Sequence, residues 1–330
     1  MRTKGIKAKA LLLGLVTILT AASFTGCGSD AKETTEIRIG YFYNVTHAQA
    51  LLMKADGSLQ EALSDVEVKW TAFNAGPAEV EALFADEIDI GYIGPVPAVS
   101  ANVKSKGDVQ IISSATKGGA ILVKREGADI NGVEDLSGKT VAIPQIGNTQ
   151  HLALLHLLKE NGLSPVTEGG DVNVAAVANA DVANVMGRGD VDAALVPEPW
   201  GTTLLSQGAE LVLDYDAVYL DGDYDVAVVV VRKEFAKNHP ELVEQFLKVH
   251  EKATETLQKD RAGALQKMNG QLEEDTGKSL SEEILTTAFT RIGVSTKLNK
   301  ESILQFAKIS QEQEFIATLP GEDLFYESGN

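Results

Sequence analysis

The chain has 330 residues, 44% of them hydrophobic and 23% charged, a composition typical of a folded globular protein with room for two domains. Its formal net charge is −18. This acidic balance argues against nucleic acid or an anionic membrane surface as a partner of the folded part, because both bind clustered lysines and arginines. A small anionic ligand is compatible with it, since a single site can be locally favourable inside an acidic protein.

The N-terminus has the layout of a secretory signal peptide. A basic stretch, MRTKGIKAKA, precedes an apolar run that is short for a membrane span. The run ends in FTGC, and Cys27 is the only cysteine in the chain. Small residues before a cysteine at this place resemble a bacterial lipoprotein signal. We therefore expect residues 1–26 to be removed and Cys27 to be lipidated, the alternative being an ordinary signal peptide with an incidental cysteine.

Residues 27–36 continue from this cysteine in small and polar residues, which predict a solvated, flexible tether. A lipidated cysteine followed by a tether predicts an extracytoplasmic protein that is anchored to the cell membrane by its lipid. The rest of the chain contains no second cysteine, so we expect no disulfide in the folded part.

After the tether, short apolar runs alternate with stretches of helical periodicity. The strand-like runs occupy residues 37–42, 66–73, 88–94, 109–115, 120–126, 139–145, 172–177, 191–200, 210–215 and 225–233. Alternation of this kind predicts an α/β protein whose mainly parallel sheets are flanked by helices. Residues 233–317 show mostly helical periodicity and predict a C-terminal helical part that packs on one lobe.

Two parts of the chain follow one plan. EIDIGYIGP at residues 87–95 matches DVDAALVPE at residues 190–198, and each stands at the third step of its series. We therefore predict two similar lobes, with residues 37–118 and 225–330 in lobe 1 and residues 119–224 in lobe 2. AILVKRE and VAVVVVRKE are the expected strands at which the chain crosses between lobes.

Polar and small residues gather where the predicted strands end. In an open parallel sheet, ligands bind beyond the carboxyl ends of the strands, where helix N-termini present free N–H groups and partial positive charge. The candidate ligand-binding residues in these loops are Asn44, Thr46, His47, Gly76, Pro77, Gly94, Pro95, Gln145, Asn148, Thr149, Gln150, Glu198 and Trp200.

Each loop also has a purely structural interpretation. Thr46, Asn148 and Thr149 are residue types that commonly cap helices, and capping is the better explanation for any one loop alone. Several such loops on one side of two sheets favour a ligand. Glu198 either holds the lobes together or accepts a hydrogen bond from the ligand, and Trp200 offers a flat apolar wall.

Other polar residues are interpreted as structural. His151 and His156 lie beside leucines and are expected at the edge of the core, and Asp89 and Asp192 precede strands and are expected to be turn residues. No arginine stands in the crevice loops, and Lys117, near the first crossing, is the nearest basic candidate.

Catalytic signatures are missing from the sequence. It contains no GxSxG, HExxH, CxxC or Walker motif, and its five histidines are scattered. We therefore expect a protein that is not an enzyme and that has no cofactor and no metal site.

The chain resembles the extracytoplasmic solute-binding proteins of ABC importers, specifically the nitrate, sulfonate and taurine group. The resemblance is carried by IRIGYF, WTAFNAGPAEVEALFADEIDIGYIGPVPA, AILVKREGADINGVEDLSGKTVAIPQIGNTQH and GDVDAALVPEPW, and it spans nearly all of the mature chain. It implies a two-lobe, periplasmic-binding-protein-like type II fold with two crossing strands. It also implies a binding site in the cleft between the lobes.

The same resemblance implies a function. A monomer would capture a small oxyanion, foremost an aliphatic sulfonate, and deliver it to a membrane permease driven by a cytoplasmic ATPase. We expect helix N-termini and the side chains of Asn44, Thr46, Asn148 and Thr149 to hold the oxyanion. The alternatives are nitrate, bicarbonate or a thiamin-precursor pyrimidine as ligand, an enzyme on the same fold, or a surface sensor lipoprotein.

Overall fold

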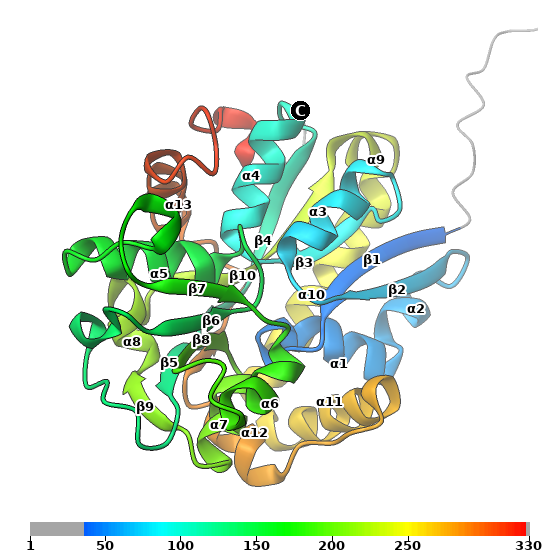
Figure 1. Cartoon of the computed structure of the whole chain (residues 1–330). Helices are drawn as coiled ribbons and strands as arrows, with labels where there is room; N and C mark the ends of the chain where they lie inside the picture. The colour runs from blue at the N-terminus through cyan, green and yellow to red at the C-terminus, as the bar shows by residue number, and fades with distance from the viewer. Residues whose placement is uncertain (1–35, 328–330) are drawn as a thin grey trace, which may run out of the picture. The chain divides into compact units, whose positions relative to one another are not determined.

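The computed structural model describes residues 36–327 (Figure 1). The predicted signal peptide, Cys27 and almost all of the predicted tether lie outside the described residues, so those predictions stay untested. Within residues 36–327, no helix combines the length and the apolar character that crossing a membrane requires.

The first sheet has six strands in the order β11-β4-β10-β3-β1-β2. They are β1 (Glu36–Phe42), β2 (Glu67–Phe73), β3 (Ile90–Ile93), β4 (Val109–Gly118), β10 (Asp225–Arg232) and β11 (Ile292–Val294). Strands β2 and β3 pair in parallel with β1, whereas β10 pairs antiparallel with both β3 and β4. Strand β11 also pairs antiparallel with β4, so β1, β2, β3 and β4 run in one direction and β10 and β11 run against them. Most strands of the sheet therefore share one direction, as the alternating pattern predicted, although β10 separates β4 from the other three.

The second sheet repeats this arrangement in the order β7-β6-β8-β5-β9. Its strands are β5 (Ala120–Lys124), β6 (Thr140–Ile143), β7 (Asn173–Ala176), β8 (Ala193–Pro197) and β9 (Glu210–Leu213). The antiparallel strand β5 lies between β8 and β9, just as β10 lies between β3 and β4. Strands β5 and β10 are the first strands after the chain changes sheets, so the two predicted crossing segments are confirmed.

Helices occupy the intervals between strands. They are α1 (Ala48–Asp56), α2 (Ser58–Ala62), α3 (Gly76–Phe84), α4 (Pro95–Ser105), α5 (Thr149–Glu160), α6 (Val182–Gly187), α7 (Trp200–Ser206), α8 (Tyr215–Val218), α9 (Lys233–Asn238), α10 (Pro240–Lys259), α11 (Arg261–Thr276), α12 (Glu282–Ala288) and α13 (Lys300–Glu312). A 3₁₀ turn, η1 (Val45–His47), precedes α1.

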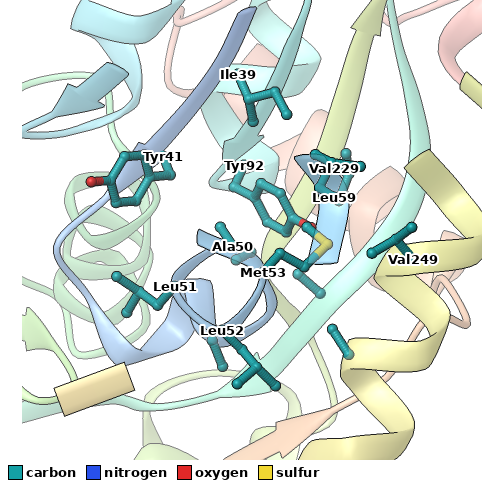
Figure 2. Packing of buried hydrophobic residues seen from close by; sticks show 14 of the residues in the cluster. Ile39, Tyr41, Ala50, Leu51, Leu52, Met53, Leu59, Tyr92, Val229 and Val249 are labelled. Atoms are coloured by element: carbon teal, nitrogen blue, oxygen red, sulfur yellow. The ribbon is translucent and has the colours of Figure 1, made fainter. Parts of the chain in front are cut away.

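The core of the first sheet follows from the two-residue period of its strands. In β10, Val229 and Val231 pack into the cluster that holds α1, α10 and α11, whereas Val228 and Val230 pack into the cluster under α3 and α4. A strand buried on both faces reads as a continuous apolar run, which explains VAVVVV. Figure 2 shows Val229 with Ile39, Tyr92 and Met53 inside the first cluster.

The prediction that the C-terminal helical part packs on one lobe is wrong for α13. Its Ile303 and Ala307 belong to the cluster of the first sheet, whereas Phe306 belongs to the cluster of the second sheet and stacks on Tyr219 at 4.3 Å. A helix can present different residues to different neighbours around its axis, and this sharing is invisible in its periodicity. The boundaries of the two lobes stay a prediction.

Asp89 is more than the turn residue that its position suggested. It is 2% exposed and accepts hydrogen bonds from Arg38 and Arg232 at 2.7 Å each. Burial alone would raise the pKa of Asp89, but the hydrogen bonds from these arginines outweigh it and hold the pKa below its ordinary value. Asp192 similarly accepts from the Thr140 N–H at 3.0 Å and from Arg125. Both aspartates fasten strands at the end away from the crevice.

Candidate functional site

A small cavity lies among the loops at the carboxyl ends of both sheets; we call it the inner cavity. It has a volume of about 20 Å³. It is lined by Phe42, Asn44, Thr46, His47, Asn74, Ala75, Gly76, Gly94, Pro97, Pro144, Asn148, Thr149, Gln150, Asn179, Pro197 and Val226. The loops that follow β1, β2, β3, β6, β7 and β8 therefore meet here, as the rule for open parallel sheets requires.

The structure gathers most of the predicted site residues around this cavity. Eight of them line it: Asn44, Thr46, His47, Gly76, Gly94, Asn148, Thr149 and Gln150. Trp200 lines a neighbouring cavity instead, and Pro77, Pro95, Gln145 and Glu198 line neither. Position alone does not show binding, so the ligand-binding roles of all thirteen residues stay predictions.

Two asparagines of the inner cavity were missing from the predicted set. Asn74 stands in the loop Asn74-Ala75-Gly76-Pro77, whose later members were predicted. Asn179 follows β7 in VANAD, and its buried Oδ1 has no hydrogen-bond partner among the described residues. The signal that could have found both is the one used elsewhere, an asparagine directly after a predicted strand.

The polar side chains of the inner cavity are all neutral. Asparagine, threonine, glutamine and histidine line it, and within residues 36–327 its lining contains no Asp, Glu, Lys or Arg. Lys117, the nearest basic candidate from the sequence, instead pairs with Asp223 at 2.7 Å and lines neither cavity. Any anion held here would depend on neutral donors and helix termini.

Helix starts supply the positive potential of the site. The first residue of α3, Gly76, and the first residue of α5, Thr149, both line the inner cavity, as does Gly94, which precedes α4. The N–H groups of a first helical turn have no partners within the helix and carry partial positive charge. Three helix N-termini therefore converge on one small space, which is the arrangement that binds anions elsewhere.

Capping accounts for only part of these loops. Asn148 is the N-cap of α5, because its Oδ1 accepts the His151 N–H at 2.8 Å. Thr149 is the first helical residue and not a cap, and its buried Oγ1 has no hydrogen-bond partner among the described residues. In the first loop neither Asn44 nor Thr46 caps a helix with its side chain.

His47 is held as a neutral hydrogen-bond donor. It is 2% exposed and stacks on Phe42, with the ring centroids 4.3 Å apart. Its Nδ1 accepts the Phe42 N–H at 3.2 Å, which assigns the ring proton to Nε2. Burial lowers the pKa of His47 to about 3, so the ring stays uncharged at ordinary pH. The ring can offer Nε2–H to a ligand, but not a positive charge.

The two sheets approach each other closely at the inner cavity. A Cβ added to Gly94 would lie 2.3 Å from Thr149 Oγ1, which is far inside van der Waals contact. Gly94 has φ −68°, so glycine is needed here for space and not for backbone conformation. A second link joins the sheets nearby, because Trp200 Nε1 donates to Asn44 Oδ1 at 2.7 Å.

A second and larger space, the outer cavity, adjoins the inner one. Its volume is about 510 Å³, and it shares Asn44, Asn74 and Asn179 with the inner cavity. Its other walls are Tyr43, Phe73, Ala180, Ala183, Pro199, Trp200, Thr203, Leu204, Gln207, Leu272, Thr276, Lys278, Ser279, Leu280, Ser281 and Ile284. Residues 272–284 belong to the C-terminal helical part, and no local pattern indicated that they approach the crevice.

Glu198 joins α7 to Arg291 and lines neither cavity. It is fully buried and accepts the Thr202 N–H and hydroxyl at 2.9 Å each, while Arg291 lies 3.2 Å away. Burial raises the pKa of Glu198, although these hydrogen bonds and the arginine oppose the shift. Arg291 stands just before β11 of the first sheet and also contacts Asp214 after β9 of the second. Of the two roles considered for Glu198, the joining role fits its contacts.

No group of three or more histidine, cysteine or acidic side chains in the described part of the chain could hold a metal ion.

Sequence comparisons identify relatives of this chain. A model of the NMT1-like family matches residues 30–268. The "Taurine-binding periplasmic protein" of Escherichia coli (strain K12) is 30% identical over 233 residues, which are 70% of this chain and 68% of that protein. A "Putative aliphatic sulfonates-binding protein" of Bacillus subtilis (strain 168) is 27% identical over 253 residues, 75% and 73% of the two chains.

Solved structures show the same fold. The alkanesulfonate-binding protein SsuA from Xanthomonas axonopodis pv. citri, bound to MOPS, superposes with a TM-score of 0.76 at 22% identity and covers 89% of this chain and 99% of that one. The periplasmic nitrate-binding protein NrtA from Synechocystis PCC 6803 superposes with a TM-score of 0.68 at 14% identity, covering 86% and 83%. The predicted periplasmic-binding-protein-like α/β fold is confirmed.

Proposed function

The chain belongs to the NMT1-like family, and from this premise we propose that it is the solute-binding component of an ABC importer for aliphatic sulfonates. It captures and delivers its ligand without chemical change. Support comes from the relatives, which are named for taurine and aliphatic sulfonates.

One observation carries the proposal: a small inner cavity with neutral donors opens beside a large outer cavity. A sulfonate is a monoanion, which helix N-termini and neutral side chains can balance. Sulfate could use the same donors, but it has no tail to occupy the outer cavity. Nitrate and bicarbonate are also monoanions, but they have no tail to occupy the outer cavity. The pairing of the two spaces therefore favours a sulfonate head with a carbon tail.

The proposed head-group site takes donors from both sheets. Thr46 and His47 follow β1, and Asn148, Thr149 and Gln150 follow β6, with the α4 and α5 N-termini between them. Thr149 Oγ1 and His47 Nε2–H are the donors that no capping bond uses. Asn44 Oδ1 already accepts a hydrogen bond from Trp200 Nε1, so the predicted contact of Asn44 with the ligand would involve Trp200 as well.

Ligand entry requires the sheets to separate. The inner cavity holds about one water-sized group, which is less than a sulfonate needs. We propose that the lobes, residues 37–118 with 225–330 and residues 119–224, part to admit the ligand and close when it contacts both. The closed form, stabilised by these contacts, is the form that the permease recognises.

The proposed setting follows from the same family. The relatives are periplasmic binding proteins, and this chain accordingly works outside the cytoplasm beside a permease with a cytoplasmic ATPase. Lipidation at Cys27, tethering through residues 27–36 and a monomeric state complete the proposal; each can be checked by mass spectrometry of the membrane fraction and by light scattering.

Calorimetric titration of the soluble chain of residues 28–330, made without the lipid anchor, tests the proposed ligand. Butanesulfonate should bind, and nitrate, bicarbonate and sulfate should not. Thr149→Val, which removes the unpartnered hydroxyl, should weaken butanesulfonate binding about tenfold, the usual value of a hydrogen bond to a charged group. Thr71→Val on exposed β2 is the matched control and should bind normally. Binding of nitrate or bicarbonate alone would keep the transporter and replace the ligand.

A further inference from the structure

Ten of the nineteen residues that line the outer cavity are apolar or aromatic, eight are neutral polar residues and one is a lysine. Leu272, Leu280 and Ile284 come from the segment around α11 and α12, and Leu204 and Trp200 come from α7 on the opposite side. These side chains surround a volume of about 510 Å³, about 25 times that of the inner cavity. Ligand pockets of this kind gain affinity from the apolar surface that the ligand removes from water.

Neither cavity is lined by a carboxylate that could pair with a positive charge. Within residues 36–327, the linings of both cavities contain no Asp or Glu, and the charged side chain on the outer wall is Lys278, which repels a cation. Glu198 stands between Pro197 and Pro199, which line the two cavities, but Thr202 and Arg291 engage its carboxylate.

The junction between the cavities is equally unsuited to a cation. Asn44 and Asn179 lie there, where the ammonium group of taurine would sit two carbons from its sulfonate. Asn44 Oδ1 already accepts from Trp200, and the unpartnered Asn179 Oδ1 is a neutral acceptor. A neutral acceptor can receive a hydrogen bond, but it cannot offset the desolvation of a full charge.

We propose that the outer cavity receives an uncharged hydrocarbon tail, so that this chain selects sulfonates with apolar tails of several carbons over taurine. This inference rests on the proposed sulfonate site in the inner cavity. This ligand specificity distinguishes the chain from the taurine-binding relative, with which it shares 30% identity. Each methylene added to the tail should raise affinity about fourfold until the cavity is filled.

A titration series on the soluble chain of residues 28–330 tests the proposal. The ligands are methane-, ethane-, butane- and hexanesulfonate together with taurine, which matches ethanesulfonate in length and adds only the ammonium group. We expect affinity to rise along the alkyl series and taurine to bind at least tenfold more weakly than ethanesulfonate. Taurine binding as tightly as ethanesulfonate, or an alkyl series without a trend, would overturn the tail assignment alone. Failure of every sulfonate to bind would overturn the sulfonate function with it.

A matched pair of variants locates the tail. Ile284→Asp places a carboxylate on the outer wall, and Leu304→Asp places one on an exposed face of α13, where the leucine is 43% exposed and lines neither cavity. Ile284→Asp should weaken hexanesulfonate binding at least tenfold. It should also reduce the difference in affinity between taurine and ethanesulfonate. Leu304→Asp should bind all of these ligands with the affinity of the parent chain. Thermal unfolding of both variants confirms that they fold. Unchanged hexanesulfonate affinity in Ile284→Asp would exclude the outer cavity as the tail site.

Discussion

Two loops of this molecule contain a histidine that fastens the loop backbone, yet only one of these histidines reaches the site. His47 Nδ1 accepts the Phe42 N–H at 3.2 Å, and His151 Nδ1 accepts the Gly147 N–H at 3.1 Å. Burial lowers the pKa of both, to about 3 and about 4 respectively. His47 lines the inner cavity, whereas His151 stacks on Phe315 with centroids 5.1 Å apart.

The difference comes from how each helix begins. In the second loop Asn148 caps α5, so Thr149 and Gln150 occupy the first turn at the cavity and His151 falls behind them. In the first loop no side chain caps the turn, and a 3₁₀ turn brings His47 itself to the entrance of α1. The two loops are similar in composition, but their polar side chains have different roles. The presence or absence of a helix cap determines which of these residues can contact a ligand.

The largest expected effect on sulfonate affinity comes from Gly94, where the loop after β3 contacts the loop after β6. Gly94→Ala would place a Cβ 2.3 Å from Thr149 Oγ1 while suiting the backbone of residue 94. Overpacking of this kind costs about 1–3 kcal/mol in the closed form, so sulfonate affinity should fall roughly five- to a hundredfold. Calorimetry measures the loss.

Gly270→Ala is the matched control for this substitution, because Gly270 lies in α11 with no atom within 4 Å of an added Cβ. It should bind like the parent chain and melt at the same or a higher temperature. Normal affinity in Gly94→Ala would show that the loops do not close on the ligand at this contact.

Replacing each histidine by phenylalanine tests the difference between His47 and His151 directly. Both His47→Phe and His151→Phe keep a ring and leave one backbone N–H without its acceptor, so both should lower stability by about 1–3 kcal/mol. Only His47→Phe removes a donor from the inner cavity, and it alone should weaken sulfonate binding, by about tenfold. Equal affinities in the two variants would remove His47 from the proposed site.

The same histidines predict a separation of binding from stability in acid. A histidine whose pKa is lowered by folding stabilises the protein fully above its unfolded pKa of about 6.5 and loses that contribution as the pH falls towards the folded value. Three buried histidines behave in this way, His47 with a pKa of about 3 and His151 and His250 with pKa values of about 4. The stability that these histidines contribute should therefore fall as the pH is lowered from 6.5 to 4.5, whereas burial raises the pKa of Glu79, which acts in the opposite direction. Removing one histidine isolates the first effect: the melting temperature of His151→Phe should drop less than that of the parent chain over this range.

Sulfonate affinity should stay constant over the part of that range in which the protein is folded, because His47 remains neutral there. Calorimetry at pH 5.5, 6.5 and 7.5 checks this expectation. Tighter binding at pH 5.5 than at pH 7.5 would mean that a protonated histidine contacts the anion, contrary to the neutral site described above.

The smallest expected effects come from replacing Asn148 and Asn44, which should differ in how much stability they remove. Asn148→Ala removes the cap of α5 and should lower stability by about 1 kcal/mol in addition to weakening binding. Asn44→Ala removes no helix cap but breaks the 2.7 Å bond to Trp200, so it should act mainly on affinity. Chemical denaturation beside calorimetry distinguishes them, and an equal loss of stability in both would contradict the assignment of caps.

Much of this architecture is readable from the sequence because it rests on local patterns. The crossing strands were predicted from their runs of branched apolar residues, and β10 shows why: it is buried on both faces. The resemblance of EIDIGYIGP to DVDAALVPE likewise corresponds to β3 and β8, which occupy the same place in the order of the two sheets.

What the sequence could not give depends on contacts between distant segments. The approach of residues 272–284 to the outer cavity, the link from Arg291 to Glu198 and Asp214, and the sharing of α13 between two cores all depend on how helices pack. Nothing in the local pattern of a helix specifies its partner. The same limit explains why Glu198, a carboxylate in a crevice loop, proved to face inward to an arginine.

A crystal structure of residues 28–330 with hexanesulfonate tests the central claim most directly. The account predicts the sulfonate group in an enlarged inner cavity, with its oxygens within about 3 Å of Thr149 Oγ1 and His47 Nε2, as hydrogen bonding requires, and the alkyl chain against Trp200 in the outer cavity. A sulfonate bound elsewhere, or one bound with its tail in the inner cavity, would contradict it.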